Sequence, residues 1–545
     1  MVCQMDLGWS RSFEKGLIQR MRNGAAMKLK KKLTKPSYVL FWIAFSVIHP
    51  SFGGEQKGNT DNVQKTPMTI SRQALADEAF WRCLGEKPGD FRALVESEPY
   101  AAVNPKDAKN IVAAWQTRGY KGGAAQVSVS FDGGRTWSAP RTLPVNACAG
   151  GPYPELQSAS DPWVSFGPDG RVYAGAIGFT PSELGPDLAN AIIITTSPDG
   201  GRTWERPAAA ALSLTPYRWH DNEAIIAHPG LPGTAYVLTT RYEYPALKDI
   251  KQGEIPKRRK EDGPLIGFGP AAFSKTSDGG RTWSKVKIIT PLIEGGRVSA
   301  PQMVIDPRDS RLYTIYYNDD EVANYGGEIK KRADSKGAAI SFVESGDKGE
   351  TWSEQKDIAR FVRVPENKHP LSGETVVQAE DILQASIDPK SGTIFVAFAD
   401  GRFFDGKRLG ISLTCSGDKG RTWMTPIPVS SPEEQTAWLP GIAVNDEGTV
   451  GVVYMSSDFN PGERKTVPVS VKLRTFAVQD GKLVFRTEKV IDRFNYGWPG
   501  DYLVLLAIGR EFHTVYGRSN YGESEPMPRK RSEAFDRKPM DIVFK

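Results

Sequence analysis

The chain has 545 residues, of which 39% are hydrophobic and 25% are charged, as in an ordinary soluble globular protein. Its formal net charge is +6, but residues 1–53 alone carry a surplus of seven positive charges, so the remaining residues carry a net charge of −1. A nearly neutral body excludes nucleic-acid binding that is driven by charge, and we expect no nucleic-acid partner.

The first segment resembles an export signal. Residues 28–35 are basic, residues 38–48 form an apolar run, and residues 51–53 offer small side chains at the two positions that a signal peptidase reads. The apolar run is too short to span a bilayer, so we expect no transmembrane anchor in the mature chain. We predict a secreted or periplasmic protein, in which residues 1–53 are an upstream extension plus a signal peptide and Met27 is the true start.

Export makes a disulfide the expected state of paired cysteines. Cys3 lies in the segment that export would remove, which leaves three others. Cys83 and Cys148 lie in Gly-rich, polar sequence, whereas Cys415 ends the apolar segment GISLTC. We predict a disulfide between Cys83 and Cys148 and a buried, free Cys415, with three free thiols as the alternative.

One short motif occurs five times at intervals of about 70 residues, which indicates an array of one structural unit. The copies read SFDGGRTW (130–137), SPDGGRTW (197–204), TSDGGRTW (276–283), SGDKGETW (345–352) and SGDKGRTW (416–423). Their aspartates are Asp132, Asp199, Asp278, Asp347 and Asp418.

The residue types of this motif are those of a hairpin turn that follows a β-rich run. Asp can accept backbone N–H groups across the turn, and Gly supplies the positive φ that the corner needs. Trp can bury a large apolar surface against a neighbouring unit. We therefore interpret the five aspartates as structural, because site chemistry rarely recurs five times in one array.

A weaker repeat lies upstream of the motif and occurs seven times, as in EPYAAVNPKDAKNIVAAW (98–115) and GDYLVLLAIGREFHTVY (500–516). Each copy reads as two apolar strands around a Pro/Asp/Gly turn. Together with the motif hairpin it predicts an all-β fold, a β-propeller of four-stranded blades over residues 96–545, with seven blades preferred and six as the alternative. Residues 54–95 are a lead-in that could supply the missing strand of the last blade and close the ring.

The repeated motif is identified as the Asp-box, so the chain resembles the sialidase (neuraminidase) superfamily of BNR-repeat propellers. The five copies match the Asp-box at nearly every position. This resemblance implies propeller blades without implying one activity, because it also reaches xyloglucanases, sorting receptors and photosystem assembly factors. Sialidases have six blades, so the preferred count of seven departs from that family.

Candidate site residues come from strand ends that face one side of the propeller. In a four-stranded meander, the start of the first strand and the end of the second share one face, and the Asp-boxes lie on the opposite face. Carboxylates, arginines and aromatic groups on one funnel are what sugar recognition uses, although any single charged residue could merely solvate a loop end. The predicted substrate-binding residues are Arg241, Arg218, Arg297, His220, Asp161, Trp163 and Arg402.

The resemblance implies roles for some funnel residues. Sialidases use a Tyr nucleophile activated by a Glu, an Asp acid/base and three arginines that bind the substrate carboxylate. Here Glu223 opens an inner strand and Arg241 ends the next strand, similar to the family pattern, and Tyr502 looks like the nucleophile. The predicted catalytic residues are Glu223, Asp221, Tyr502 and Asp501.

The sequence departs from the family at two points. The family's Arg-Ile-Pro motif is absent from the first inner strand, which reads Glu96-Ser97-Glu98-Pro99. Glu223 and Tyr502 lie four units apart, whereas the family places its pair about two blades apart.

The function predicted from these observations is that of a secreted, sialidase-like glycoside hydrolase acting on a glycan through acids and arginines of the funnel. The alternative is a non-catalytic propeller that binds a glycan or a protein partner on the same face. The five histidines are dispersed without zinc-ligand spacing, and no phosphate-binding glycine loop occurs, so we expect no metal and no cofactor.

Overall fold

The computed structural model describes residues 67–71, 78–85, 95–119, 122–180, 188–252, 254, 267–320, 337–364, 382–457, 468–496, 500–520 and 540–545. The chain divides into two compact units, and all of these residues belong to the larger one. The predicted signal peptide lies outside the described residues.

The described residues form seven antiparallel sheets of four strands each, and each sheet is one blade. The first three blades consist of β2 (Val95–Asn104), β3 (Asp107–Arg118), β4 (Gly123–Ser130) and β5 (Arg141–Thr142); β6 (Ser158–Phe166), β7 (Val172–Thr180), β8 (Ala189–Ser197) and β9 (Ala208–Ser213); and β10 (Arg218–Ala227), β11 (Ala235–Glu243), β12 (Ala271–Thr276) and β13 (Lys287–Ile288). The next two consist of β14 (Arg297–Ile305), β15 (Leu312–Asp319), β16 (Ala339–Ser345) and β17 (Lys356–Arg360); and β18 (Leu383–Ile387), β19 (Ile394–Asp400), β20 (Gly410–Ser416) and β21 (Ile427–Pro428). The last two consist of β22 (Thr436–Val444), β23 (Val450–Ser457), β24 (Pro468–Gln479) and β25 (Lys482–Asn495); and β26 (Val504–Ile508), β27 (Glu511–Ser519), β28 (Met540–Phe544) and β1 (Met68–Thr69).

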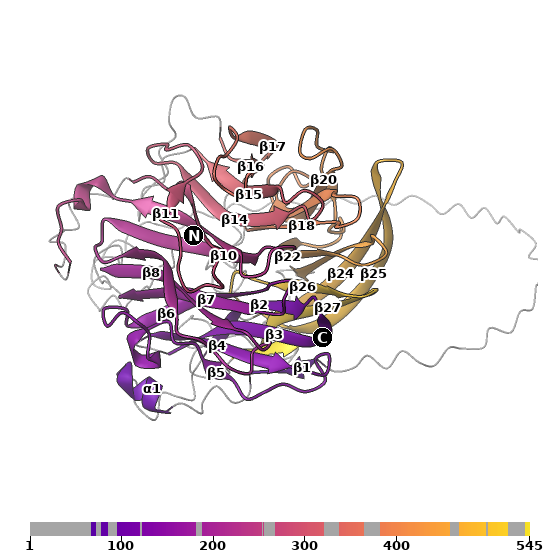
Figure 1. Ribbon diagram of the computed structural model, residues 1–545. Helices are drawn as coiled ribbons and strands as arrows, with labels where there is room; N and C mark the ends of the chain where they lie inside the picture. The colour runs from indigo at the N-terminus through magenta and orange to yellow at the C-terminus, as the bar shows by residue number, and fades with distance from the viewer. Residues whose placement is uncertain are drawn as a thin grey trace, which may run out of the picture. The chain divides into compact units, whose positions relative to one another are not determined.

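The inner strands of the blades follow one another around a ring (Figure 1). Strands β2, β6, β10, β14, β18, β22 and β26 each contact the next in this order, and β26 contacts β2. The apolar alternation and Gly-rich turns of each repeat therefore produce one blade, and contacts between neighbouring blades bury the core. The predicted all-β propeller with seven blades is confirmed, and the alternative of six is wrong.

The seventh blade is closed by a strand from the beginning of the described chain. Met68 pairs with Phe544 and Thr69 pairs with Val543, and the Ile70 amide donates to the carbonyl of Ile542 at 2.9 Å. The predicted lead-in thus supplies the outer strand of the last blade. Ring closure of this kind removes the open sheet edges that would otherwise pair with another chain.

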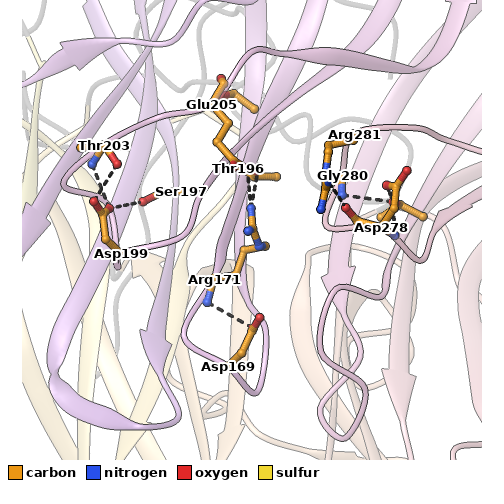
Figure 2. A network of polar contacts seen from close by, with 12 residues as sticks. Asp169, Arg171, Thr196, Ser197, Asp199, Thr203, Glu205, Asp278, Gly280 and Arg281 are labelled. Atoms are coloured by element: carbon orange, nitrogen blue, oxygen red, sulfur yellow. Dashed lines mark hydrogen bonds and ion pairs between the residues drawn. The ribbon is translucent and has the colours of Figure 1, made fainter.

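The five repeated turns share one hydrogen-bonding pattern, which Figure 2 shows for Asp199 of the second blade. Asp199 accepts from the amide of Thr203 at 2.8 Å, from the Thr203 hydroxyl at 2.6 Å and from the Ser197 hydroxyl at 2.8 Å. Asp278 makes the same three contacts in the next blade. Each aspartate therefore holds its turn closed, as the repeated sequence predicts.

The tryptophan of the repeated turn packs on the preceding blade. Trp352 meets Phe273 edge-on with ring centroids 5.3 Å apart, and Trp137 of the first blade meets Phe544 of the seventh at 5.5 Å. A Cβ atom on Gly134 would lie 2.3 Å from the Phe544 ring, so glycine is required where the turn approaches that ring. The repeated turns thus connect neighbouring blades, including the pair that closes the ring.

A short helix and a disulfide lie beside the first blade. Helix α1 (Glu78–Cys83) buries Phe80 and Trp81, and the 3₁₀ helix η3 (Ala147–Ala149) contacts it. Cys83 and Cys148 form the predicted disulfide, whose Cα atoms are 5.7 Å apart. Cys415 is free and buried, as predicted. A second 3₁₀ helix, η4 (Pro245–Leu247), follows β11 in the third blade.

Candidate functional site

The inner strands of five blades contain the same β-bulge. In each of these strands one residue has φ between 45° and 53°, and the pairing to the second strand is shifted at that point. The five bulged residues are Glu98, Asp161, Asn222, Ala300 and Leu439. A left-handed backbone costs a non-glycine residue about 1–3 kcal/mol. Bulges often lie next to functional sites because they redirect side chains. The residues at this repeated bulge are therefore candidates for a functional site.

The residue after the bulged one differs between the blades. It is a buried proline in four of them, namely Pro99, Pro162, Pro301 and Pro440. In the third blade it is Glu223, and in the seventh, where Gly500 has a φ of 84°, it is Asp501. The corresponding segment of the fifth blade lies outside the described residues. Both acids were predicted as catalytic, and they occupy the position that proline occupies in four other blades.

One position further on, three consecutive blades place an aromatic ring. The first-blade ring of Tyr100 stacks on Trp163 of the second blade with centroids 3.5 Å apart. Trp163 meets Tyr502 of the seventh blade edge-on at 5.7 Å. We call these three residues the aromatic trio. Its packing fixes Tyr502, which is 5% exposed, beside the strands that carry the acids.

Four carboxyl groups lie within electrostatic reach of the Tyr502 hydroxyl. Burial raises the pKa of Tyr502 well above its ordinary value, and the charges of four acids raise it further. The four are Asp161, Glu223, Glu98 and Asp501. Although Glu223 and Tyr502 lie four units apart in the sequence, the charge of Glu223 acts on the Tyr502 hydroxyl in the closed ring. We call these four acids together with Asp221 the carboxyl cluster.

Glu223 is the most enclosed acid of the carboxyl cluster, with 1% of its surface exposed. Neither of its carboxyl oxygens has a hydrogen bond of normal geometry with the described residues, although the amides of Glu223 itself and of Ile177 lie near enough to favour the charged form. Burial, and then the charge of Asp161, raises the pKa of Glu223 well above its ordinary value. Burying a carboxyl group without partners is unfavourable, so stability does not explain this acid.

Glu98 and Asp161, the bulged residues of the first two blades, hydrogen-bond to each other through their side chains. Burial raises the pKa of Glu98 well above its ordinary value and the charge of Asp161 raises it further, while Arg118 opposes the shift. The neighbouring acid therefore helps to keep the proton on Glu98. Asp161 is half-buried, as is Asp501, so solvent reaches the carboxyl cluster at these two acids.

Glu98 and Arg118 lie at strand ends that the sequence assigns to the funnel face, but neither was among the predicted site residues. Glu98 had a visible signal, because Glu98-Pro99 and Asp161-Pro162 are equivalent pairs of residues in adjacent repeats. Arg118 ends strand β3, and nothing in its local sequence distinguishes it from the other charged strand ends.

Asp221 and His220 precede the bulge of the third blade. Asp221 accepts from the Asn222 amide at 2.9 Å. Burial, with a contribution from the charge of Asp161, raises the pKa of Asp221 to about 7, against the influence of Arg297. Burial lowers the pKa of His220 to about 3, so the imidazole is neutral at physiological pH. The charge of Arg297, a predicted substrate-binding residue, therefore favours the ionised form of Asp221 in the carboxyl cluster.

The other predicted arginines form ion pairs. Arg241 and Arg218 both pair with Oε1 of Glu243, at 2.5 Å and 2.9 Å. Arg402, in the fifth blade, pairs with the buried Asp400 at 2.8 Å. Among the described residues, no contact joins Arg402 to the carboxyl cluster. The structure thus brings together most of the predicted acids with Tyr502 and Trp163, and it leaves these three arginines with carboxylate partners of their own.

Two further properties concern the described residues as a whole. They contain no group of three or more His, Cys, Asp or Glu side chains arranged to hold a metal ion. Within the same residues, no helix has the length and apolar character needed to cross a membrane.

Comparison with known proteins was made by family, by sequence and by structure. No family model and no curated protein matches the chain. Similar solved structures include a Hadza microbial sialidase, with 15% identity over 79% of this chain and 72% of that chain and a TM-score of 0.40. The NanB sialidase from Streptococcus pneumoniae has 11% identity, with 83% of this chain and 94% of that chain covered and a TM-score of 0.41.

A third similar structure is an α-L-arabinofuranosidase of Fusarium graminearum, with 15% identity, 66% of this chain and 88% of that chain covered, and a TM-score of 0.39. Sialidases are thus among the similar solved structures. At identities of 11–15% this likeness concerns the fold alone.

Proposed function

We propose that this protein is an exported glycoside hydrolase whose active site is the carboxyl cluster beside the aromatic trio. The observation that carries the proposal is the replacement of the bulge proline by Glu223. Four blades build the same bulge with proline, so folding does not require an acid there. A buried carboxyl group that lacks a side-chain partner among the described residues, at a position that the fold can fill with proline, supports a chemical role.

Glycosidic cleavage needs one carboxyl group that holds a proton and a second that is ionised. Burial raises the pKa of Glu223 well above its ordinary value, so it can protonate the leaving-group oxygen. Asp161 and Asp501 are half-buried and reach solvent, so either can act as the ionised partner. The charge of Asp161 also helps to keep Glu223 protonated, which couples the two roles.

Tyr502 has a position suited to the reacting centre as well. Its hydroxyl lies within reach of four acids, whose charges oppose the loss of its proton. The phenol is therefore neutral at rest, and it can become a nucleophile only if an ionised carboxylate beside it, and not the protonated Glu223, takes the proton during attack. Trp163 fixes the ring, and Asp221 contributes another acid whose pKa lies near 7.

A second candidate function is a non-catalytic propeller that binds a glycan on the same face. The enclosure of both Glu223 oxygens favours this reading, because a substrate could approach only past the half-buried acids Asp161 and Asp501. In that case the carboxyl cluster would bind hydroxyl groups without turnover.

The proposal is tested by screening the purified protein against aryl glycosides, sialosides included, and repeating active reactions with Glu223→Gln. We expect turnover of at least one glycoside and a decrease in kcat of about 10²-fold or more in the variant. Glu205→Gln is the matched control, since Glu205 pairs with Arg171 near the repeated turns on the opposite face (Figure 2). Binding of a glycan with no turnover by the unmodified protein would favour the second function.

A further inference from the structure

We propose that the funnel accepts an uncharged sugar residue and rejects one that carries a carboxylate. This inference rests on the proposed function, because it names the substrate class of the same site. It rests on the positions of acidic and basic side chains around the aromatic trio.

Among the described residues, acidic groups outnumber basic groups at the centre of the site. The repeated bulge directs acids from three blades toward Tyr502, at Glu98, at Asp161 and at Glu223, and Asp501 adds a fourth. Two arginines act on the carboxyl cluster, Arg118 on Glu98 and Arg297 on Asp221. Each of them faces an acid of the protein itself, so neither supplies a positive charge in excess of the acids.

The other arginines that the structure describes near these strand ends pair with other carboxylates. Glu243 pairs with both Arg218 and Arg241, and Asp319 pairs with Arg363 at 2.5 Å. An anionic ligand would have to draw a guanidinium away from such a partner, which would leave the partner's charge exposed to its neighbours. Bidentate binding of a substrate carboxylate by these arginines is therefore disfavoured.

A ligand carboxylate would also meet the carboxyl cluster itself. Like charges in a poorly solvated site repel each other more strongly than in water. A sugar hydroxyl group faces no such penalty, because carboxyl groups that keep their protons can both donate to it and accept from it. The half-buried ring of Tyr100 offers an apolar surface on which a sugar ring can stack.

The test uses pairs of aryl glycosides that differ only in a carboxylate, glucoside with glucuronide and galactoside with galacturonide, together with an aryl sialoside and neutral pentosides. We expect hydrolysis of neutral sugars only, or a preference of at least tenfold in kcat/KM for the neutral member of a pair. Hydrolysis of a sialoside or uronide with equal or higher kcat/KM, lost in Glu223→Gln, would overturn this inference and leave the proposed function standing. If no glycoside is hydrolysed, the proposed function fails and the inference fails with it.

A second variant tests the cause of the discrimination. Asp501→Asn removes an acid that solvent reaches and whose charge acts on Tyr502, while keeping the size of the side chain. We therefore expect it to raise kcat/KM for the carboxylate-bearing member relative to the neutral member by severalfold. Glu205→Gln, on the opposite face, should leave that ratio unchanged. An unchanged ratio in a folded Asp501→Asn variant would contradict the electrostatic origin of the selectivity.

Discussion

Glu223 in the third blade holds the place that Pro162 holds in the second, one residue after a bulged residue whose φ is 52° in both blades. The two inner strands have the same shift of register at this point. Because the backbone is equivalent, the difference between the two residues concerns only the side chain. Pro162 therefore shows what the same backbone position looks like without the carboxyl group of Glu223.

Glu223→Pro should fold and should be inactive. The bulge leaves Glu223 unpaired with the second strand, so proline removes no hydrogen bond of the ladder, and four other blades accommodate it. We expect a nearly unchanged melting temperature and a loss of turnover of about 10²-fold or more. Circular dichroism with temperature and an assay of the best glycoside measure the two effects. A variant that folds and keeps its turnover would remove Glu223 from the site.

Tyr502→Phe separates the hydroxyl group from the ring. The phenylalanine ring can keep the edge-on contact with Trp163, so the melting temperature should change little. If the hydroxyl group reacts or donates a hydrogen bond at the reacting centre, kcat should decrease by about 10²-fold. Equal kcat values for the variant and the unmodified enzyme would show that Tyr502 only packs.

Asp278→Ala should reduce stability and leave the chemistry intact. The carboxylate accepts hydrogen bonds from Thr282 and Thr276 that hold the repeated turn, and their loss should cost about 1–3 kcal/mol. Chemical denaturation measures the change, with Asp249→Ala, an exposed acid of the third blade, as the control. The assignment of the repeated aspartates to structure would be wrong if activity disappeared at an unchanged free energy of unfolding.

The stability of the protein should decrease as the pH rises from about 4 to 7. Burial raises the pKa of Asp221 from 3.8 to about 7, so the folded protein keeps a proton that the unfolded chain releases. The contribution is complete below pH 3.8 and is lost as the pH rises through 7. Melting temperatures between pH 4 and pH 8 should decline less steeply for Asp221→Asn than for the unmodified protein. Parallel curves for the two proteins would refute this assignment.

The disulfide should be detectable without reduction and important for stability. Peptide mapping should recover Cys83 joined to Cys148 and Cys415 as a free thiol. Loss of the bridge in Cys148→Ser should cost about 2–5 kcal/mol, because the unfolded chain gains freedom and α1 loses its attachment to the first blade. A mapped bridge that contains Cys415 would contradict the structure.

Much of the fold could be predicted because each blade is specified locally. Alternating apolar residues around a turn recur in all seven copies of the upstream repeat, so a count of those copies gave the count of blades, whereas the Asp and Trp motif occurs in five. The disulfide followed from two cysteines that flank the first repeat.

The site was harder to predict because it forms where distant repeats converge. The distance around the ring between Glu223 and Tyr502 depends on the number of blades and on closure by β1, which no local pattern contains. The roles of the arginines depend on which carboxylate each one meets, and Glu243 lies 25 residues after Arg218. Strand ends alone do not specify such partners.

Closure by Met68 and Thr69 separates the order of the blades in space from the order in which they are made. During synthesis the first blades can form while the seventh still lacks β28, so the nascent protein is an open arc with two unpaired edges. The ring becomes continuous only after residues 540–544 have emerged and met the early strand. Once closed, the ring has no structural starting point, so a circularly permuted chain that opens between two other blades should reach the same arrangement.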